Sequence, residues 1–509
     1  MQRPFILPAL SPWLTPASAF AVLLALMLMP ATPVQAQDDP TPSTGPETVA
    51  LVSSDVSPDA MQEAEQEHHG AAIPPIWLVL PFMTLLLMIA TGPLFYAHHW
   101  HHHYPKYAIG LGVIVTLYYI FVLHDITSME HALAEYLSFI ALVASLFIAA
   151  SGIFLKVNAR GTPMANVALL SVGAVIANLI ATTGAAMLFI RPYMRLNQGR
   201  LRPYHIVFFI FIVANVGGAL TPIGDPPLFL GFLRGVPFFW TFTHVWYVWL
   251  PTMIVILGIF FIIDKRNTAA STTELSEGKT IEVEGHRSFL FVIIIVLSVF
   301  IDPNVFDWVP RLHIGSIHLP FGIREIIMFS MCYVGYKFCW QEALEKNEFS
   351  FEPIREVGWL FLGIFACMVP ALALISNFAN ENADILTTGM FYWGTGVLSS
   401  VLDNAPTYLN FLAAAMGKFG QDVNMATQVQ DFANAEASLI FLQAISVAAV
   451  FFGAMTYIGN APNFMVKAIA EANNVDAPSF GGYLVKYAIP ILIPVYFVVW
   501  LVFYSGFIF

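Results

Sequence analysis

The sequence contains few charged residues and few cysteines. Asp, Glu, Lys and Arg make up 11% of its 509 residues, whereas soluble domains carry about 25%, so an ordinary water-soluble protein is excluded. Cys332, Cys339 and Cys367 lie in or beside apolar segments. Their spacing fits neither a zinc site nor a disulfide framework. Phosphate-loop and nucleophile-elbow motifs are absent, so the sequence supports neither an ATP-driven pump nor a hydrolase.

Apolar residues dominate instead. They account for 58% of the chain, and the mean hydropathy is +0.72. Repeated runs are long enough to cross about 30 Å of hydrocarbon, which predicts an all-α polytopic membrane protein. We expect twelve elements, near residues 74–95, 106–124, 133–155, 164–190, 204–234, 242–264, 288–301, 320–338, 357–376, 386–417, 438–470 and 485–507.

The N-terminal region has the pattern of a secretory signal. Arg3 is followed by the apolar run AFAVLLALMLM and by the small-x-small pattern Val34-Gln35-Ala36, so residues 1–36 are interpreted as a signal peptide. An uncleaved first helix is the alternative. Residues 37–72 are rich in Pro, Ser, Asp and Glu, which is typical of a disordered segment, here on the periplasmic side.

The two halves of the membrane region, 73–264 and 288–509, carry the same series of elements. The polar stretch 265–287 between them is interpreted as a cytoplasmic linker. GALTPIGDPP (218–227) aligns without gaps to GAMTYIGNAP (453–462), with six of ten positions identical. Pro and Gly in both segments predict a broken transmembrane helix in each half.

Each half also contains an apolar stretch interrupted by small and polar residues, at 171–186 and at 399–415. Either stretch is an ordinary helix or a re-entrant hairpin. If both are re-entrant, most of the 21 basic residues fall on the cytoplasmic side. The outer side then holds only Arg234, Arg311, Arg324 and Lys418. The positive-inside rule therefore favours two inverted-topology repeats, each with a re-entrant hairpin.

Asp225 lies at the break of the first half, where a charge is costly in a membrane. An intramembrane carboxylate is by default a site for an ion or a proton. The second half has Asn460 at the aligned position and supplies Asp403 from its interrupted stretch. We therefore expect both aspartates to bind sodium or protons, because hard cations prefer oxygen ligands. Neutral ligands are expected from Asn178, Thr182, Asn215, Thr221, Asn404, Thr407, Thr456 and Asn460.

Both aspartates also have a structural interpretation. Asp225 could cap the helix that follows its own break, and Asp403, in the sequence LDNAP, could cap a hairpin helix. The Asn and Thr residues could do no more than satisfy broken backbone.

Four segments carry a family resemblance: NVGGALTPIGDPPLFLGFLRGVPF, ANLIATTGAAMLFIRP, SVLDNAPTYLNFL and YIGNAPNFMVKAIA. They resemble the ion transporter superfamily, and most closely its NhaD-like and citrate-transporter-like sodium/proton antiporters. The resemblance implies inverted repeats, two re-entrant hairpins and a homodimer. Dicarboxylate symporters of the superfamily typically carry Ser-Asn-Thr at the hairpin tips. The matching places here are Ala177-Asn178-Leu179 and Asp403-Asn404-Ala405.

These features lead to a sodium/proton antiporter of a bacterial-type inner membrane, with lipid as its surroundings and with no cofactor, nucleic acid or enzymatic activity. A cation-coupled transporter of citrate or another organic anion is the first alternative, but two aspartates would repel such a substrate. An intramembrane aspartate-dependent enzyme is an alternative of another class, which the repeat disfavours. The histidine-rich segment 98–106 is interpreted as a polar interfacial loop, with metal binding or pH sensing as alternatives.

Overall fold

The computed structural model describes residues 74–506, apart from 268, 273–279, 302–308, 310–312, 315–316, 319–321 and 474. The expected signal peptide (1–36) and periplasmic segment (37–72) lie outside the described residues. Part of the expected cytoplasmic linker does so too, and so do the basic residues Lys279 and Arg311, which entered the charge-bias argument.

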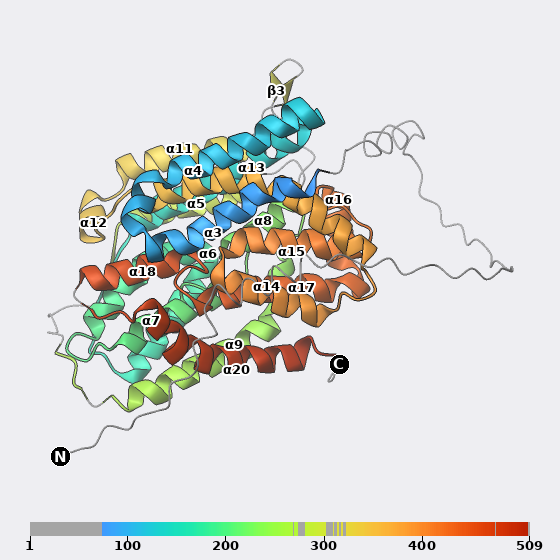
Figure 1. Ribbon diagram of the computed structural model, residues 1–509. Coiled ribbons are helices and arrows are strands. Elements are labelled where there is room, and N and C mark those ends of the chain that lie inside the picture. Colours follow the sequence, from blue (N-terminus) through green and yellow to red (C-terminus); the bar gives the residue numbers. More distant parts are fainter. Residues whose placement is uncertain are drawn as a thin grey trace. The chain divides into compact units, whose positions relative to one another are not determined.

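The described part of the chain is mostly helical (Figure 1). The first half contains η1 (Ile76–Val79), α3 (Leu80–Phe95), α4 (Ala97–Tyr118), η2 (Tyr119–Leu123), α5 (Ile126–Ser151), α6 (Pro163–Leu196), α7 (Pro203–Ile212), η3 (Val216–Gly218), α8 (Pro226–Arg234) and α9 (Trp240–Lys265). The second half contains α10 (His286–Val299), α11 (Ile323–Phe338), α12 (Gln341–Lys346), α13 (Glu352–Glu381), α14 (Thr388–Val401), α15 (Asn404–Lys418), α16 (Ala426–Asn434), α17 (Glu436–Phe452), η4 (Gly453–Met455), α18 (Ala461–Ala472), α19 (Phe480–Tyr483), η5 (Leu484–Ala488) and α20 (Ile489–Phe503).

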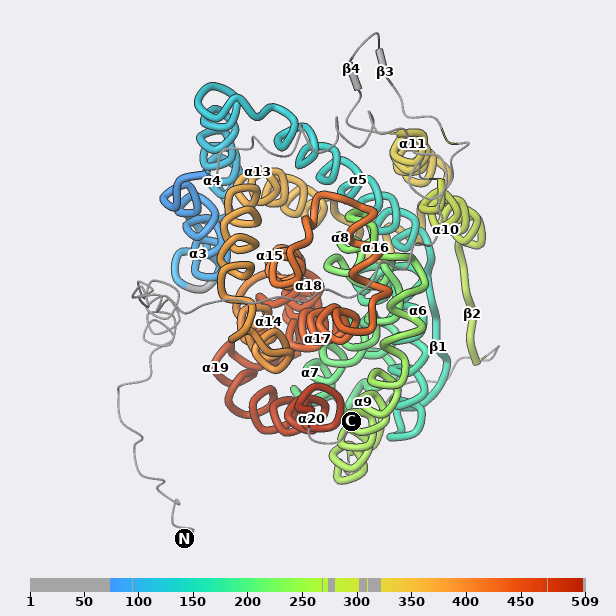
Figure 2. The backbone as a smooth tube through the Cα atoms, turned by 90° about the vertical axis from the view of Figure 1, so that its right-hand side faces the viewer, coloured from blue at the N-terminus to red at the C-terminus, as the bar shows by residue number. Residues whose placement is uncertain are grey.

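Two short antiparallel strand pairs interrupt the helices. β1 (Phe154–Val157) pairs with β2 (Ile281–Glu284), and β3 (His313–Ile314) pairs with β4 (Ile317–His318). Figure 2 shows β1 and β2 side by side. The expected linker therefore contributes a strand that ties the start of the second half to the end of α5, which the sequence pattern did not predict.

Among the described residues, eight helices are long and apolar enough to cross a membrane. Several of them, such as α4, α9 and α20, carry exposed large apolar side chains on their outer faces. Such exposure is costly in water and favourable in lipid, so the structure supports a multi-pass membrane protein.

The central helices α7 and α17 are buried on all sides. The side chains from His205 to Ile212 on α7 are inaccessible to solvent, and so are most of those on α17. A helix that is apolar all round belongs in the interior. Both helices stop at the expected breaks. Break 1 (213–225) separates α7 from α8, and break 2 (453–460) separates α17 from α18.

Helix α6 folds back on itself and is called hairpin 1 below. Its backbone leaves the helical region at Ile180 and Ala181, where Ala181 has φ 64° and ψ 157°. Asn166 near its start and Asn197 at its end exchange two hydrogen bonds, of 2.9 and 2.7 Å. A straight helix would separate these residues by about 45 Å, so the two arms lie antiparallel.

Helices α14 and α15 form the equivalent hairpin 2 around Leu402 and Asp403. The rings of Phe391 and Phe411, on opposite arms, have centroids 6.3 Å apart. At the open end, Lys418 donates a hydrogen bond to the carbonyl of Ala383. Figure 2 shows α14, α15 and α17 alongside one another. Both interrupted stretches of the sequence thus turn back in space.

The expectation of a loop at 98–106 is wrong. Helix α4 begins at Ala97 and runs through the histidines and through Pro105 to Tyr118. Low hydropathy and a proline suggested a loop. Proline nevertheless fits inside this helix, because the polar end of α4 can extend beyond the hydrocarbon, where water satisfies a freed carbonyl.

Candidate functional site: four helix breaks around Asp225

The two broken helices present matching residues at the same backbone geometry. Asp225 (φ −141°, ψ 141°) directly precedes α8, and Asn460 (φ −152°, ψ 140°) directly precedes α18. Neither side chain caps its own helix. The capping interpretation of Asp225 is therefore wrong, and its carboxylate is directed to other elements.

The Asp225 carboxylate is fully buried and accepts three hydrogen bonds. Oδ1 accepts from the Thr182 hydroxyl at 2.8 Å and from Asn460 Nδ2 at 2.8 Å. Oδ2 accepts from Asn404 Nδ2 at 2.6 Å. Thr182 follows the turn of hairpin 1, and Asn404 follows the turn of hairpin 2. One carboxylate therefore joins both hairpins and both breaks.

Every one of these donors is neutral. Among the described residues, no Lys, Arg or His forms an ion pair with Asp225. The side-chain oxygen Oδ1 of Asn404 is buried and has no hydrogen-bond partner in the part of the chain that the structure describes. An ionised carboxylate without a counter-charge is costly in a dry interior. The centre can therefore accommodate one positive charge, and an unused oxygen lies on the residue that contacts the carboxylate.

A second set of contacts fixes the hairpins to the breaks, in the same way in both halves. Thr221 donates to the carbonyl of Asn178 at 2.6 Å, and its hydroxyl accepts from Gly224 N at 3.1 Å. Thr456 donates to the carbonyl of Ser400 at 2.6 Å and accepts from Gly459 N at 3.1 Å.

These contacts make Asn178 and Ser400 equivalent, and the residues that contact Asp225, Thr182 and Asn404, follow them by four positions each.

Glycine is required where the broken backbone approaches itself. A Cβ on Gly224 would lie 2.1 Å from the carbonyl oxygen of Gly218, and one on Gly459 would lie 2.6 Å from that of Gly453. Real Cβ contacts are never this short, so a side chain at either position would force the break open. The identical glycines of the repeat thus shape the backbone that holds Asp225.

Asn178 and Asn215 satisfy backbone groups. Asn178 donates to the carbonyls of Ala174 and Gly217 and accepts from Leu220 N. Asn215 donates to the carbonyl of Ile210, and its Oδ1 lies 3.3 Å from Asn460 Nδ2. Asn178 therefore braces break 1, whereas Asn215 lies one contact away from the carboxylate.

Asp403 has the geometry of a helix cap. Its Oδ1 accepts from Ala405 N at 3.0 Å, and the hydroxyl of Thr407 donates to its backbone carbonyl at 2.9 Å. Asp403 lies within electrostatic range of Asp225, but no hydrogen bond joins the two side chains in the described structure. The capping interpretation therefore describes its observed contacts.

Asn463 was missed by the sequence reasoning. It accepts from Asn215 Nδ2 at 2.6 Å and donates to the carbonyls of Gly453 and Thr456. It lies three residues after Asn460 in the motif GNAPN, so its place next to the second break was the only available signal.

The family match is consistent with this architecture. The family model described as "Putative citrate transport" matches residues 71–504. The chain belongs to this family. Membership supports a secondary transporter and makes a multi-pass membrane location the expected one. No curated protein matches the sequence significantly.

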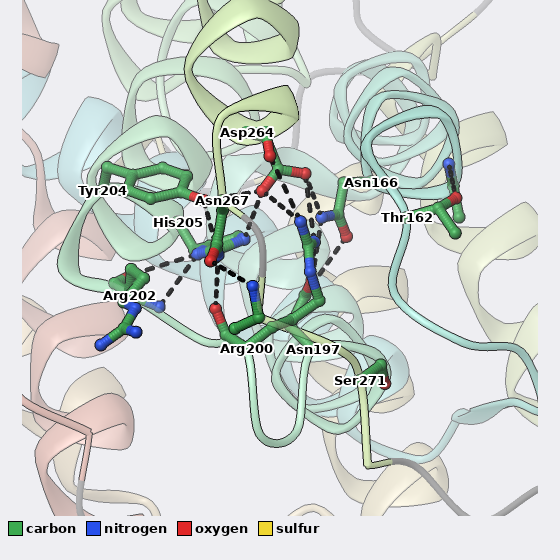
Figure 3. A network of polar contacts seen from close by, with 12 residues as sticks. Thr162, Asn166, Asn197, Arg200, Arg202, Tyr204, His205, Asp264, Asn267 and Ser271 are labelled. Carbon is green, nitrogen blue, oxygen red and sulfur yellow. Dashed lines mark hydrogen bonds and ion pairs between the residues drawn. The ribbon is translucent and has the colours of Figure 1, made fainter.

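A separate polar cluster closes the open end of hairpin 1 (Figure 3). Arg200 donates to both carboxylate oxygens of Asp264, at 2.9 and 3.1 Å. Asp264 also accepts from Tyr204 at 2.7 Å and from Asn166 at 2.9 Å, and His205 Nε2 lies 3.1 Å from it. This transporter thus fixes hairpin 1 to α7 and α9 with a paired buried charge. No spacing in the sequence indicates this cluster, because its members lie up to about a hundred residues apart.

Proposed function

We propose that this chain exchanges sodium for protons across the inner membrane, and that Asp225 binds one or the other. The observation that carries the proposal is the buried carboxylate with three neutral donors and no basic partner among the described residues. A carboxylate in such a place is stable when it is protonated or when it holds a cation. The two states exclude each other, and this exclusion couples the two fluxes.

Thr182, Asn404 and Asn460 would supply the neutral oxygens for a bound sodium ion. Each side chain now donates to Asp225, and each also carries an oxygen that can turn toward a cation. Oxygen ligands suit small hard cations. The unpartnered Oδ1 of Asn404 supports its assignment as a ligand. Asp403 acts in this proposal by its negative charge near the site, while it caps α15.

The proposed membrane arrangement has two inverted repeats with re-entrant hairpins. The open end of hairpin 1 carries Arg191, Arg195, Arg200 and Arg202, whereas that of hairpin 2 carries Lys418. Positive charge accumulates on the cytoplasmic side. Hairpin 1 would thus open to the cytoplasm and hairpin 2 to the outside. Transport by such a pair needs no enzymatic step, and a homodimer is expected.

Cysteine labelling tests this arrangement. The native cysteines are first replaced by alanine, and Gln198→Cys and Asn424→Cys are then made separately; both positions are exposed. A membrane-impermeant maleimide should label Gln198→Cys only from the cytoplasm and Asn424→Cys only from outside. Labelling of both from the same side would contradict the inverted arrangement.

Citrate transport is the second candidate, and the description of the family favours it. A tricarboxylate needs positive partners, yet Arg191 and Arg234 are already paired with Glu348 and Glu135. The test is sodium uptake into proton-loaded liposomes, with and without citrate. Uptake without citrate supports the exchanger. Uptake that appears only with citrate would overturn it.

A further inference from the structure

The histidine-rich start of α4 forms pairs that only a helix creates. His98 and His102 are four residues apart, and so are His99 and His103. Residues at this spacing lie on one helical face with about 5–6 Å between their Cβ atoms. The ring centroids of His98 and His102 are 4.7 Å apart. Two histidines at i and i+4 are the arrangement with which helical zinc motifs bind their metal.

Hydrogen bonding has already selected the ring nitrogen that is available. Nδ1 of His102 lies 2.9 Å from the carbonyl oxygen of His98. A carbonyl only accepts, so this nitrogen carries the proton, and Nε2 keeps its lone pair when the ring is neutral. Ligating histidines typically donate their other N–H in this way, which orients the ring.

The neighbouring pair, His99 and His103, is less available for binding a metal. Nε2 of His99 is bonded to the hydroxyl of Tyr107 at 2.8 Å, and the rings of His99 and His103 stack with centroids 4.3 Å apart. A metal would have to break both contacts. His98 and His102 are both exposed on the helix surface. The first pair is therefore the better chelate.

The position of α4 leaves this face open to water. The span from Ala97 to Leu123 has 27 residues and is about 40 Å long, whereas the hydrocarbon core is about 30 Å thick. The polar end of the span therefore extends beyond the hydrocarbon. Glu356 of α13 lies within electrostatic range of His101 and adds negative potential there.

We propose that His98 and His102 form a two-imidazole site for a divalent transition metal such as Zn²⁺, Ni²⁺ or Cu²⁺. Imidazole suits these ions, whereas Mg²⁺ and Ca²⁺ prefer oxygen. No group of three or more His, Cys, Asp or Glu in the described part of the chain is placed to hold a metal. Two protein ligands leave the other positions to water, so the metal is exchangeable rather than structural. This site is separate from Asp225.

The test is a titration of the full chain, purified in detergent with a histidine-free tag and stripped with EDTA. NiCl₂ and ZnCl₂ should bind, and MgCl₂ should not. The His98→Ala/His102→Ala variant should bind Ni²⁺ at least tenfold more weakly, since even the loss of an outer partner of a ligating histidine costs roughly 10–100-fold. Sodium exchange in metal-free buffer should be unchanged in this variant.

Two further variants provide the comparison. His131→Ala/His286→Ala removes two exposed histidines elsewhere and should bind Ni²⁺ like the parent chain, and His99→Ala/His103→Ala should lose less than the 98/102 variant. The spectrum of bound Cu²⁺ should show coupling to two nitrogens, lost in the 98/102 variant. Unchanged Ni²⁺ binding by the 98/102 variant, or equal loss in the 131/286 variant, would overturn the proposal.

Discussion

Asp225→Asn should abolish exchange while leaving the fold intact. Oδ1 of the new amide can still accept from Thr182 and Asn460, as the carboxylate does at 2.8 Å. Its nitrogen would face Nδ2 of Asn404. A half-turn of the Asn404 amide would bring the unpartnered Oδ1 to that nitrogen. The half-turn moves Nδ2 of Asn404 to the place of the formerly unpartnered oxygen, so the number of unpaired buried groups does not change, and the free energy of unfolding should change by about 1 kcal/mol or less.

Asp225→Ala provides the contrast. It removes both acceptor oxygens and leaves the Thr182 hydroxyl and Asn404 Nδ2 without their acceptor, whereas Asn460 Nδ2 keeps the carbonyl of Ala214. Each orphaned donor costs about 1–3 kcal/mol, so the sum is roughly 2 kcal/mol or more. Thermal unfolding of the purified protein should therefore give nearly equal midpoints for the parent chain and Asp225→Asn, and a clearly lower midpoint for Asp225→Ala.

The transport assay is sodium uptake into proton-loaded liposomes. Asp225→Asn should show only the background rate, because an amide neither releases a proton nor offers a charge to sodium. Asp431→Asn, the same change at an exposed position, should transport normally. Sodium uptake at the parent rate by well-folded Asp225→Asn would refute the central role of this carboxylate.

The other predictions concern competition, the cap, the base of hairpin 1 and the break. Raising the proton concentration on the side of sodium entry should raise the apparent KM for sodium, because protonation removes the charge that binds it; a KM that does not vary with pH would contradict a shared site. Asp403→Asn should leave the thermal midpoint nearly unchanged, since Asn caps helices as well as Asp does, and should shift the pH profile of exchange because one negative charge near the site is lost; an unchanged profile would limit Asp403 to the cap. Arg200→Ala should destabilise the fold by about 3–5 kcal/mol, because it removes the permanently charged partner of the buried Asp264 carboxylate, whereas the exposed Arg202→Ala should not, and equal midpoints in thermal unfolding would disprove this. Gly224→Ala should reduce the yield of folded protein, whereas Gly258→Ala, where a Cβ meets nothing within 4 Å, should be tolerated; equal yields would contradict a sterically closed break.

The sequence predicted the helix breaks and the residue at their centre, because both have local causes. Pro and Gly within apolar runs interrupt a helix wherever they occur, and the ungapped repeat alone is enough to align Asp225 with Asn460. Thr182 and Asn404 were named as candidates on the same grounds. Their shared contact with Asp225 required the folded arrangement.

Two features escaped sequence reasoning because their causes are not local. The Asp264 cluster exists only because hairpin 1 brings Asn166 back to Asn197 beside the end of α9. The helical start of α4 was not predicted, because hydropathy identifies only the part of a helix that lies in the hydrocarbon. The helix itself continues as far as its backbone groups find hydrogen-bond partners. The equivalent positions of the two hairpins are identified by contacts across the fold, because the hydroxyls of Thr221 and Thr456 bond to the carbonyls of Asn178 and Ser400.

The two halves carry different residues at the aligned positions 225 and 460, and this difference sets how many positive charges the proposed site binds. The backbone at Asp225 and Asn460 is nearly the same, and contacts from both hairpins converge there, yet only one of the two side chains is a carboxylate. A second aspartate at 460 would place two negative charges in direct contact, which is unfavourable in low dielectric. With one carboxylate, one proton or one monovalent cation neutralises the centre. In the proposed exchange the asparagine would act as the neutral donor that orients Asp225 after the cation has left.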